Sequence, residues 1–256
     1  MDWSGARSGA RRHIWLAHVR AGQLLELQNG RTGNEVVGHL AQLRAASPAG
    51  LAVGLDFAFS FPAWFVPQRG HASVDGLWQE VGQQGERWLA ACDPPFWGRP
   101  GRRRPALPAH HRRTEAGARV GAVHAKSVFQ IGGAGAVGTG SLRGMPHLLE
   151  LRRAGFTIWP FDPPSPWPVV EIYPRLLTGA VHKRNGEARA LYLSRSPWPI
   201  PEPFLSRASG SEDAFDAAVS AFAMDRHVAE LGALGQSDDP VTLLEGEVWT
   251  PRNIDP

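Results

Sequence analysis

The chain reads Leu51-Ala52-Val53-Gly54-Leu55-Asp56-Phe57 at the position of its clearest buried strand. A short apolar run that ends in an acid is typical of a strand inside a sheet, whose carboxyl end opens onto a site. Before it, the pattern predicts a hairpin with strands over 13–19 and 23–27, and then a helix from Asn34. With a first strand at Asp2, the predicted order is β-β-β-α-β.

The rest of the chain alternates regular elements with segments rich in proline and glycine. The apolar spacing predicts helices over 74–91, 145–154 and 211–231, and strands over 156–161 and 169–173. Ser209 and Glu212 have the spacing of a capping box before the last helix. Between residues 62 and 125 the periodicity is weak outside the first of these helices. We therefore predict one domain over residues 1–256, with an insertion or lid at about 62–125.

The composition is that of a globular chain. Its 256 residues are 43% hydrophobic, which is enough for a sizeable core. No apolar run reaches the roughly 18 residues that a membrane span needs, and no secretory leader precedes the first motif. The single cysteine, Cys92, excludes an internal disulfide and a cysteine-rich zinc site. We expect a cytoplasmic enzyme that does not enter a membrane.

Five carboxylates lie where a buried strand or helix is expected, which is a costly place for a charge without a partner. They are Asp2, Asp56, Glu171, Asp213 and Asp216. Acids that converge from distant parts of a chain are commonly held by a divalent metal, because Mg²⁺ and Mn²⁺ take oxygen ligands. Asp213 and Asp216 lie three residues apart, so a helix projects both from one face. The acids therefore indicate a site for a divalent metal.

Several of these acids also have a simpler explanation. Asp56 could cap the loop that follows its strand, and Glu171 could form an ion pair with Lys183 or Arg175. Asp213 alone would suit the positive end of a helix dipole. The dipole does not account for the second acid of that helix, which lies deeper in an apolar stretch.

Positive charge is concentrated in one segment. Residues 99–113 hold six arginines and no acid, and without them the chain has 21 basic against 24 acidic residues. A basic, proline-containing loop is typical of segments that contact phosphates, which predicts nucleic-acid binding by Arg102, Arg103, Arg104, Arg112 and Arg113. The alternative is a solvated loop, because the whole chain uses 25 arginines and only two lysines.

A glycine-rich turn offers a different function. Gly133-Ala134-Gly135-Ala136-Val137-Gly138 has the glycine spacing of a dinucleotide-binding turn, and a predicted helix and strand follow it. Gly140, Gly144 and Pro146 interrupt the turns where the phosphate-binding helix should begin. The alternative function is a dinucleotide-binding oxidoreductase, although the same backbone N–H groups would equally suit a phosphate beside Lys126.

The motifs as a set resemble a family of domains described as predicted nucleases of the ribonuclease H-like superfamily. The resemblance spans nearly the whole chain and rests on Asp2-Trp3-Ser4-Gly5, residues 54–62, Lys126-Ser127-Val128-Phe129-Gln130, Val170-Glu171-Ile172-Tyr173-Pro174 and Glu212-Asp213-Ala214-Phe215-Asp216-Ala217. It implies a mixed five-stranded central sheet with helices on both faces and an irregular basic insertion. One departure is that only Met1 precedes Asp2, whereas the first acid of this superfamily usually lies inside a strand.

The same resemblance implies a function. By it, Asp2, Asp56, Glu171, Asp213 and Asp216 would bind Mg²⁺ or Mn²⁺. The implied reaction is phosphodiester hydrolysis with two divalent ions, in which Lys126 would offset charge on the phosphate. We therefore expect a metal-dependent nuclease whose partner is DNA or RNA. The alternatives are the oxidoreductase and a catalytically silent nucleic-acid-binding protein of the same fold.

Overall fold

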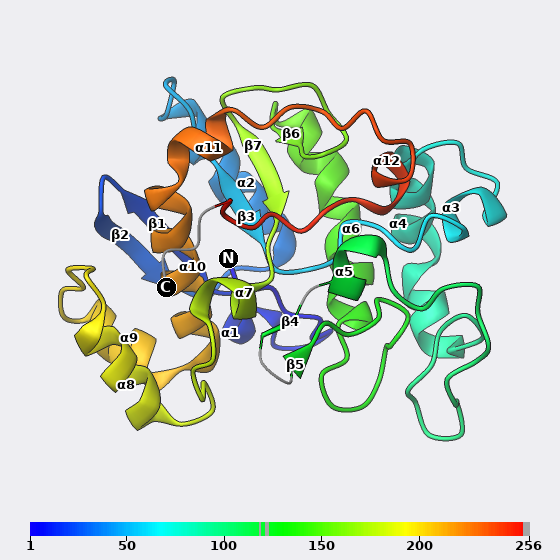
Figure 1. The fold of residues 1–256 in the computed structure, drawn as a ribbon, viewed down its shortest axis with the longest axis horizontal. Coiled ribbons are helices and arrows are strands. Elements are labelled where there is room, and N and C mark those ends of the chain that lie inside the picture. Colours follow the sequence, from blue (N-terminus) through cyan, green and yellow to red (C-terminus); the bar gives the residue numbers. More distant parts are fainter. Residues whose placement is uncertain (118, 121–122, 253–256) are drawn as a thin grey trace.

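The computed structural model describes residues 1–117, 119–120 and 123–252, and it has an α/β fold (Figure 1). Its strands are β1 (Leu16–Arg20), β2 (Gln23–Gln28), β3 (Val53–Leu55), β4 (Arg119–Val120), β5 (Val123–His124), β6 (Thr157–Ile158) and β7 (Pro168–Glu171). Its helices are α1 (Ala10–His13), α2 (Gly33–Ala45), α3 (Phe65–Gln68), α4 (Val74–Ala91), α5 (Arg113–Gly117), α6 (Gly138–Arg153), α7 (Pro174–Thr178), α8 (Gly186–Arg195), α9 (Phe204–Gly210), α10 (Glu212–Arg226), α11 (Val228–Gly232) and α12 (Thr242–Glu245). The α/β class predicted from the sequence is confirmed.

The central sheet is parallel and has three strands in the order β3-β7-β6. Val53 pairs with Val169 and Leu55 pairs with Glu171, while Ile158 of β6 flanks Val169 from the other side. The hairpin β1-β2 forms a separate antiparallel sheet. The described residues therefore do not form the predicted five-stranded mixed sheet as one sheet.

Met1 and Asp2 lie between the hairpin and the parallel sheet. Asp2 forms an antiparallel bridge with Trp15, with N···O distances of 3.0 and 3.1 Å. On the other side, the nitrogen of Met1 donates to the carbonyl of Gly54 at 2.8 Å. The amide of Asp56 donates to the carbonyl of Met1 at 3.3 Å. A single short segment thus joins the two sheets through backbone hydrogen bonds.

This first segment is short because the chain turns toward α6. Gly5 packs so closely on the start of α6 that a Cβ there would lie 2.6 Å from the backbone nitrogen of Gly140. The guanidinium of Arg143, also on α6, donates to the carbonyl of Gly5. These contacts take the chain out of the sheet directly after Asp2 and Trp3. The predicted sheet is interrupted at this position for that reason.

The two faces of the parallel sheet pack against different helices. Because side chains alternate along a strand, Leu55 and Val169 point to one face, and Gly54 and Val170 point to the other. Leu55 and Val169 belong to the main hydrophobic core, which they share with residues of α2, α4 and α6. On the opposite face, a Cβ at Gly54 would lie 2.5 Å from Sδ of Met224, so α10 packs directly against β3. Figure 1 shows β3 and β7 between α10 with the hairpin on the left and α4 with α6 on the right.

The helix predicted over 74–91 is α4, and it is part of the core and not a lid. Leu77, Trp78 and Leu89 are buried in the main core, and α4 packs along α6. The indole of Trp78 donates to the carbonyl of Phe59 at 2.7 Å. Much of the predicted insertion is therefore integral to the fold. None of the helices in the described ranges is long and apolar enough to cross a membrane.

Two helix boundaries differ from the predictions. The hydroxyl of Ser211, and not that of the predicted Ser209, accepts a backbone N–H of the first turn of α10. The helix predicted over 211–231 is divided into α10 and α11. Helix α6 begins at Gly138 and not near residue 145. The backbone at Gly138 packs so closely on the preceding segment that a Cβ there would lie 2.1 Å from the carbonyl oxygen of Val128. Glycine is needed at this position for close packing, whereas helix propensity counts glycine only as an unfavourable residue.

Candidate functional site

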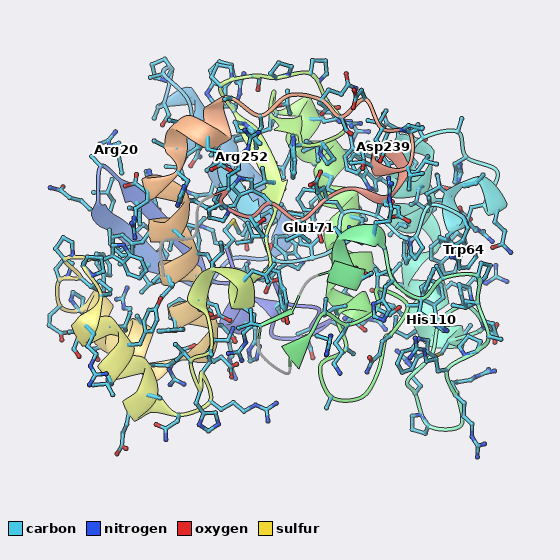
Figure 2. All side chains as sticks on the ribbon, viewed as in Figure 1. Arg20, Trp64, His110, Glu171, Asp239 and Arg252 are labelled. Carbon is cyan, nitrogen blue, oxygen red and sulfur yellow. The ribbon has the colours of Figure 1, made fainter. Side chains whose placement is uncertain are left out.

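A cavity of about 860 Å³ opens at the carboxyl ends of β3 and β7. Asp56 and Glu171 line it from these two strands, and Figure 2 places Glu171 near the middle of the molecule. The lining also includes Lys126, Arg175 and Lys183, together with the glycine-rich turn at the start of α6. Acids and cations that converge in one cavity are typical of a site for a charged ligand.

Asp2 and Asp56 form no ion pair with a side chain in the described part of the chain, and Asp56 lines the cavity. Both are half-buried, and no hydrogen bond from the described part of the chain lowers the pKa of either carboxyl. Burial, and then the charge of Asp216, raise the pKa of Asp56 to about 7, although the charge of Lys183 opposes them. Burial, and then the charges of Asp56, Asp216 and Asp213, raise the pKa of Asp2 well above its ordinary value. Burial is the largest cause in both cases, and the charge of the buried Met1 ammonium lowers the pKa of both carboxyls.

Asp216 lies on α10 and is 6% exposed. Its Oδ2 accepts a hydrogen bond from Nζ of Lys183. Its Oδ1 is buried and has no partner among the described residues. Burial raises the pKa of Asp216, even though the charge of Lys183 lowers it. Asp213, one turn earlier, is more exposed and lies 3.5 Å from Nδ1 of His13.

Glu171 has a different environment, because a buried arginine binds both of its oxygens. Arg112 is 1% exposed; its Nη1 donates to Oε2 of Glu171 at 2.8 Å, and its Nη2 donates to Oε1. The amide of Phe59 donates to the same Oε2 at 2.9 Å. The sequence suggested Lys183 or Arg175 as the ion-pair partner of Glu171, and this was wrong. Arg112 is the partner of Glu171, and Lys183 pairs with Asp216 instead.

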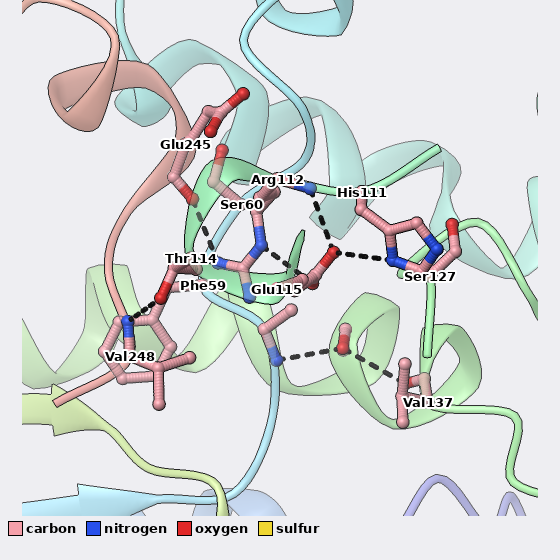
Figure 3. A network of polar contacts seen from close by, with 12 residues as sticks. Phe59, Ser60, His111, Arg112, Thr114, Glu115, Ser127, Val137, Glu245 and Val248 are labelled. Carbon is pink, nitrogen blue, oxygen red and sulfur yellow. Dashed lines mark hydrogen bonds and ion pairs between the residues drawn. The ribbon is translucent and has the colours of Figure 1, made fainter. Parts of the chain in front are cut away.

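Further contacts fix the guanidinium of Arg112 in place. Nε donates to Oε1 of Glu115 at 2.9 Å, and Nη1 also donates to the carbonyl of Glu245 at 2.9 Å. Figure 3 shows Arg112 between these two groups. Burial alone would lower the pKa of Arg112, but the charges of Glu115 and Glu171 outweigh it and raise the pKa above its ordinary value. Arg112 is therefore a permanent buried cation.

The register of the sheet explains why Glu171 is separated from the aspartates. Glu171 pairs with Leu55, so both side chains point to the face that packs on α4 and α6. Asp56 follows Leu55 and points toward the opposite face, where α10 carries Asp216. Consistent with this, the charge of Asp216 raises the pKa of Asp56 more than the charge of Glu171 does. The predicted ligands are thus divided between the two faces of the sheet.

No group of three or more His, Cys, Asp or Glu side chains within residues 1–117, 119–120 and 123–252 is arranged to hold a metal ion. The five predicted ligands therefore do not form one metal site. Asp2, Asp56 and Asp216 are close enough for the charge of one to raise the pKa of another. Glu171 instead forms an ion pair with Arg112.

The first half of the predicted nucleic-acid-binding segment is exposed. Arg102, Arg103 and Arg104 all face solvent. Nη2 of Arg102 lies 3.2 Å from a carboxylate oxygen of Asp93. The guanidinium of Arg104 lies 5.8 Å from the centre of the Trp97 ring. These three side chains are accessible to a phosphate backbone.

The two arginines at the end of that segment, Arg112 and Arg113, form ion pairs with acids of the chain. Arg112 is buried and occupied by carboxylates, so its prediction as a nucleic-acid-binding residue on an exposed loop was wrong. Arg113 is exposed but pairs with Asp239. Lys126 is exposed and lines the cavity, with its side chain against the turn at Gly135.

The glycine-rich turn does not have the structure that a dinucleotide site requires. Gly133 and Gly135 have φ values of 81° and 71°, which only glycine adopts readily. The residues before them form a turn, in which the amide of Gln130 donates to the carbonyl of Ser127 at 2.9 Å. The motif needs a strand at this place. No observation on the described residues therefore favours the oxidoreductase alternative.

The sequence did contain two weak signals for the residues that were missed. Lys183 is one of only two lysines in a chain with 25 arginines. Arg112 and Glu115 have the i, i+3 spacing of a helical ion pair. Comparisons with protein-family models, curated proteins and solved structures find no match to this chain. A function is therefore argued from the side chains of the site.

Proposed function

We propose that the chain is a divalent-metal-dependent nuclease that hydrolyses phosphodiester bonds of nucleic acid. One observation carries the proposal: Asp56 lines the cavity, burial and the charge of Asp216 raise its pKa to about 7, and its own charge raises the pKa of Asp2. Burial of ionised carboxylates and the repulsion between them both cost stability, and a bound cation would reduce that cost. Clusters of strongly perturbed acids in a cleft are a common property of functional sites.

The donor set suits Mg²⁺ or Mn²⁺ bound through a small number of carboxylates. Mg²⁺ usually keeps several waters and binds proteins through one or two carboxylates plus substrate phosphates, so a closed cage of three or more acids is not required. Asp56 and Asp2 would hold the ion. A bound divalent ion supplies an activated water and polarises the scissile phosphate.

The side chains around these acids have separate roles. Lys183 donates a hydrogen bond to one oxygen of Asp216, and its charge lowers the pKa of that carboxyl, which burial raises. Lys126 and Arg175 line the same cavity and would offset the charge of a phosphate group there. The exposed arginines at 102–104 lie on a separate loop, where they would contact the nucleic-acid backbone without reading its sequence.

The order of backbone contacts supports a ribonuclease H-like arrangement. The segment Met1–Asp2 bonds to Trp15 next to β1 on one side and to β3 on the other. The spatial order is therefore β2, β1, the first segment, β3 and β7, with an acid on the first segment and another at the end of β3. An acid on the first strand and acids on later strands are what the family resemblance implies, here with a first strand reduced to two residues.

The test is cleavage of labelled single-stranded and structured DNA and RNA by the purified chain, with and without Mg²⁺ or Mn²⁺. We expect cleavage that needs the metal and falls to background in Asp56→Asn. Asp238→Asn is the matched control, because Asp238 is exposed and lies outside the lining of the cavity. Cleavage that survives in Asp56→Asn, or that proceeds in EDTA, would contradict the proposal. Salt-sensitive binding without any cleavage would instead identify a silent nucleic-acid-binding protein.

A further inference from the structure

The lining of the large cavity includes cations that are not paired with an acid. Lys126 and Arg184 are exposed, Arg175 is half-buried, and all three line the cavity. In the described part of the chain none of them forms an ion pair with a carboxylate, whereas Arg112 and Lys183 both do. Their three positive charges are therefore available to an anionic ligand.

These cations come from two separate parts of the lining. Nη1 of Arg175, on α7, donates to the carbonyl of Val181 at 2.6 Å, which ties the connection that carries Arg184 to α7. Lys126 precedes the glycine-rich turn, and a Cβ at Gly135 would lie 3.5 Å from its Cε. Figure 1 shows α7 and α6 on different sides of the end of β7. A ligand in the cavity would thus meet positive charge from both parts.

The acids of the cavity lie deeper than its exposed cations. Asp56 is half-buried and Glu171 is 4% exposed, whereas Lys126 is exposed. Within the described ranges, the other lining acid without an ion pair is Glu212, at the start of α10. A phosphate that approaches Asp56 therefore has to leave the surface and enter the cavity past the exposed cations.

Aromatic side chains line the same cavity. Trp3 and Tyr173 are both half-buried there. Trp3 packs against Phe57 and His147, with ring centres 5.2 and 5.4 Å apart. Sites for unpaired nucleotides combine cations, which follow the phosphates, with aromatic rings, on which the bases stack. The lining of this cavity has both components.

A double helix does not suit a site of this depth. Its bases are paired and stacked, so a nucleotide enters a cavity only after it has been unpaired and unstacked, which costs free energy. A single strand has no pairing to break. The depth of Asp56 therefore favours an unpaired strand over a duplex.

We propose that the cavity binds an unpaired stretch of nucleic acid. Its phosphates would lie between Lys126 on one side and Arg175 and Arg184 on the other, with a base against Tyr173. This inference rests on the proposed function and names its substrate class, which is single-stranded DNA or RNA, or the single-stranded end of a longer molecule.

The experiment measures the fluorescence anisotropy of labelled oligothymidylate, oligouridylate and a blunt-ended hairpin duplex on addition of the full chain. It is done in EDTA, which prevents metal-dependent cleavage, and at several salt concentrations. We expect both single strands to bind at least about tenfold more tightly than the duplex.

Substitutions assign the binding to the cavity. Arg184→Ser and Lys126→Ser should each reduce the slope of log K against log salt by about 0.7 for a single strand, because each removes one phosphate contact. Arg153→Ser is the matched control, because Arg153 is exposed, lies outside the lining and is at the other end of α6, roughly 22 Å from Gly138. Tyr173→Leu should weaken single-strand binding about 5- to 150-fold, and Tyr173→Phe should bind as the wild type does.

The outcomes separate this inference from the function on which it rests. Duplex binding as tight as single-strand binding overturns it, and so does a slope that falls as much in Arg153→Ser as in the two cavity variants. Circular dichroism melting shows whether each variant is folded; if Tyr173→Leu is not, the exposed positions Lys126 and Arg184 decide the question. A chain that cuts duplex but not single strands in Mg²⁺ keeps the nuclease function and loses this substrate class. A chain that binds single strands as described and cuts nothing keeps the binding site and loses the nuclease function.

Discussion

Replacing Asp56 by asparagine should stabilise the metal-free protein at alkaline pH. The folded state raises the pKa of Asp56 from its ordinary value of 3.8 to about 7. An acid with a raised pKa disfavours the folded state whenever it is ionised. The penalty is absent below pH 3.8, increases between pH 3.8 and 7, and is complete above pH 7. Asparagine has a similar shape and no charge, so the variant should not lose stability over this interval.

The magnitude follows from the two pKa values. Their difference of about 3 corresponds to about 4 kcal/mol of unfolding free energy at pH 8, which is an upper bound. Asp2 and Asp216 share the repulsion and can bind the proton in place of Asp56, so we expect about 2 kcal/mol. For a chain of this length, that corresponds to a rise in Tm of roughly 4–8 °C.

The assay is thermal and urea unfolding of wild type and Asp56→Asn at pH 4 and pH 8, in EDTA and in excess MgCl₂. In EDTA the variant should be more stable at pH 8 and equally stable at pH 4. Added Mg²⁺ should stabilise only the wild type, by about 3 kcal/mol at a concentration of 100 times Kd. An asparagine variant that is no more stable than wild type at pH 8 would refute the reasoning, and so would an equal gain at both pH values.

Three further substitutions test the surroundings of the site. Lys183→Met leaves the ion pair of Asp216 broken and should cost about 3 kcal/mol in urea unfolding at pH 8; the cost should largely disappear at pH 4, because that pH is close to the ordinary pKa of 3.8 and the buried carboxyl of Asp216 can take up a proton at little cost. Gly144→Ala should cost about 1–3 kcal/mol in the same measurement, because a Cβ would lie 2.7 Å from the ring of Phe57 in the core; an unchanged Tm would contradict this packing. Trp78→Phe removes a buried hydrogen bond of 2.7 Å to a backbone carbonyl and should lower the unfolding free energy by about 1–3 kcal/mol; a variant as stable as wild type would show that this bond contributes nothing.

The spacing of apolar residues in the sequence was enough to predict the helices that bury one apolar face. Helix α4 occupies the predicted residues because Leu77, Trp78 and Val81 lie on one helical face, and burial of that face outweighs other signals. Helix α6 begins earlier than predicted because Gly138 and Gly144 pack against other segments at distances that only glycine allows. Helix propensity counts such residues as breakers, and their tertiary contacts lie outside any local window.

The candidate site could be predicted only in part, for a related reason. Burial of an acid can be inferred from its apolar neighbours, and Asp56, Glu171 and Asp216 do lie in or near the core. Which acids meet depends on the pairing of β3 with β7, and a register shifted by one residue would have turned Glu171 to the other face. Its ion pair with Arg112 joins residues 59 positions apart, and no local pattern encodes that contact.

The carboxyl end of the chain completes the surroundings of Glu171. Trp249 donates its amide to the carbonyl of Glu171 at 2.8 Å, and the carbonyl of Glu245 binds Arg112. Asp2, at the other extreme of the sequence, supplies one of the acids. During synthesis on a ribosome, the surroundings of Glu171 and Arg112 cannot be completed until residues 245–249 have emerged, whereas Asp2, Asp56 and Asp216 are all present well before that point.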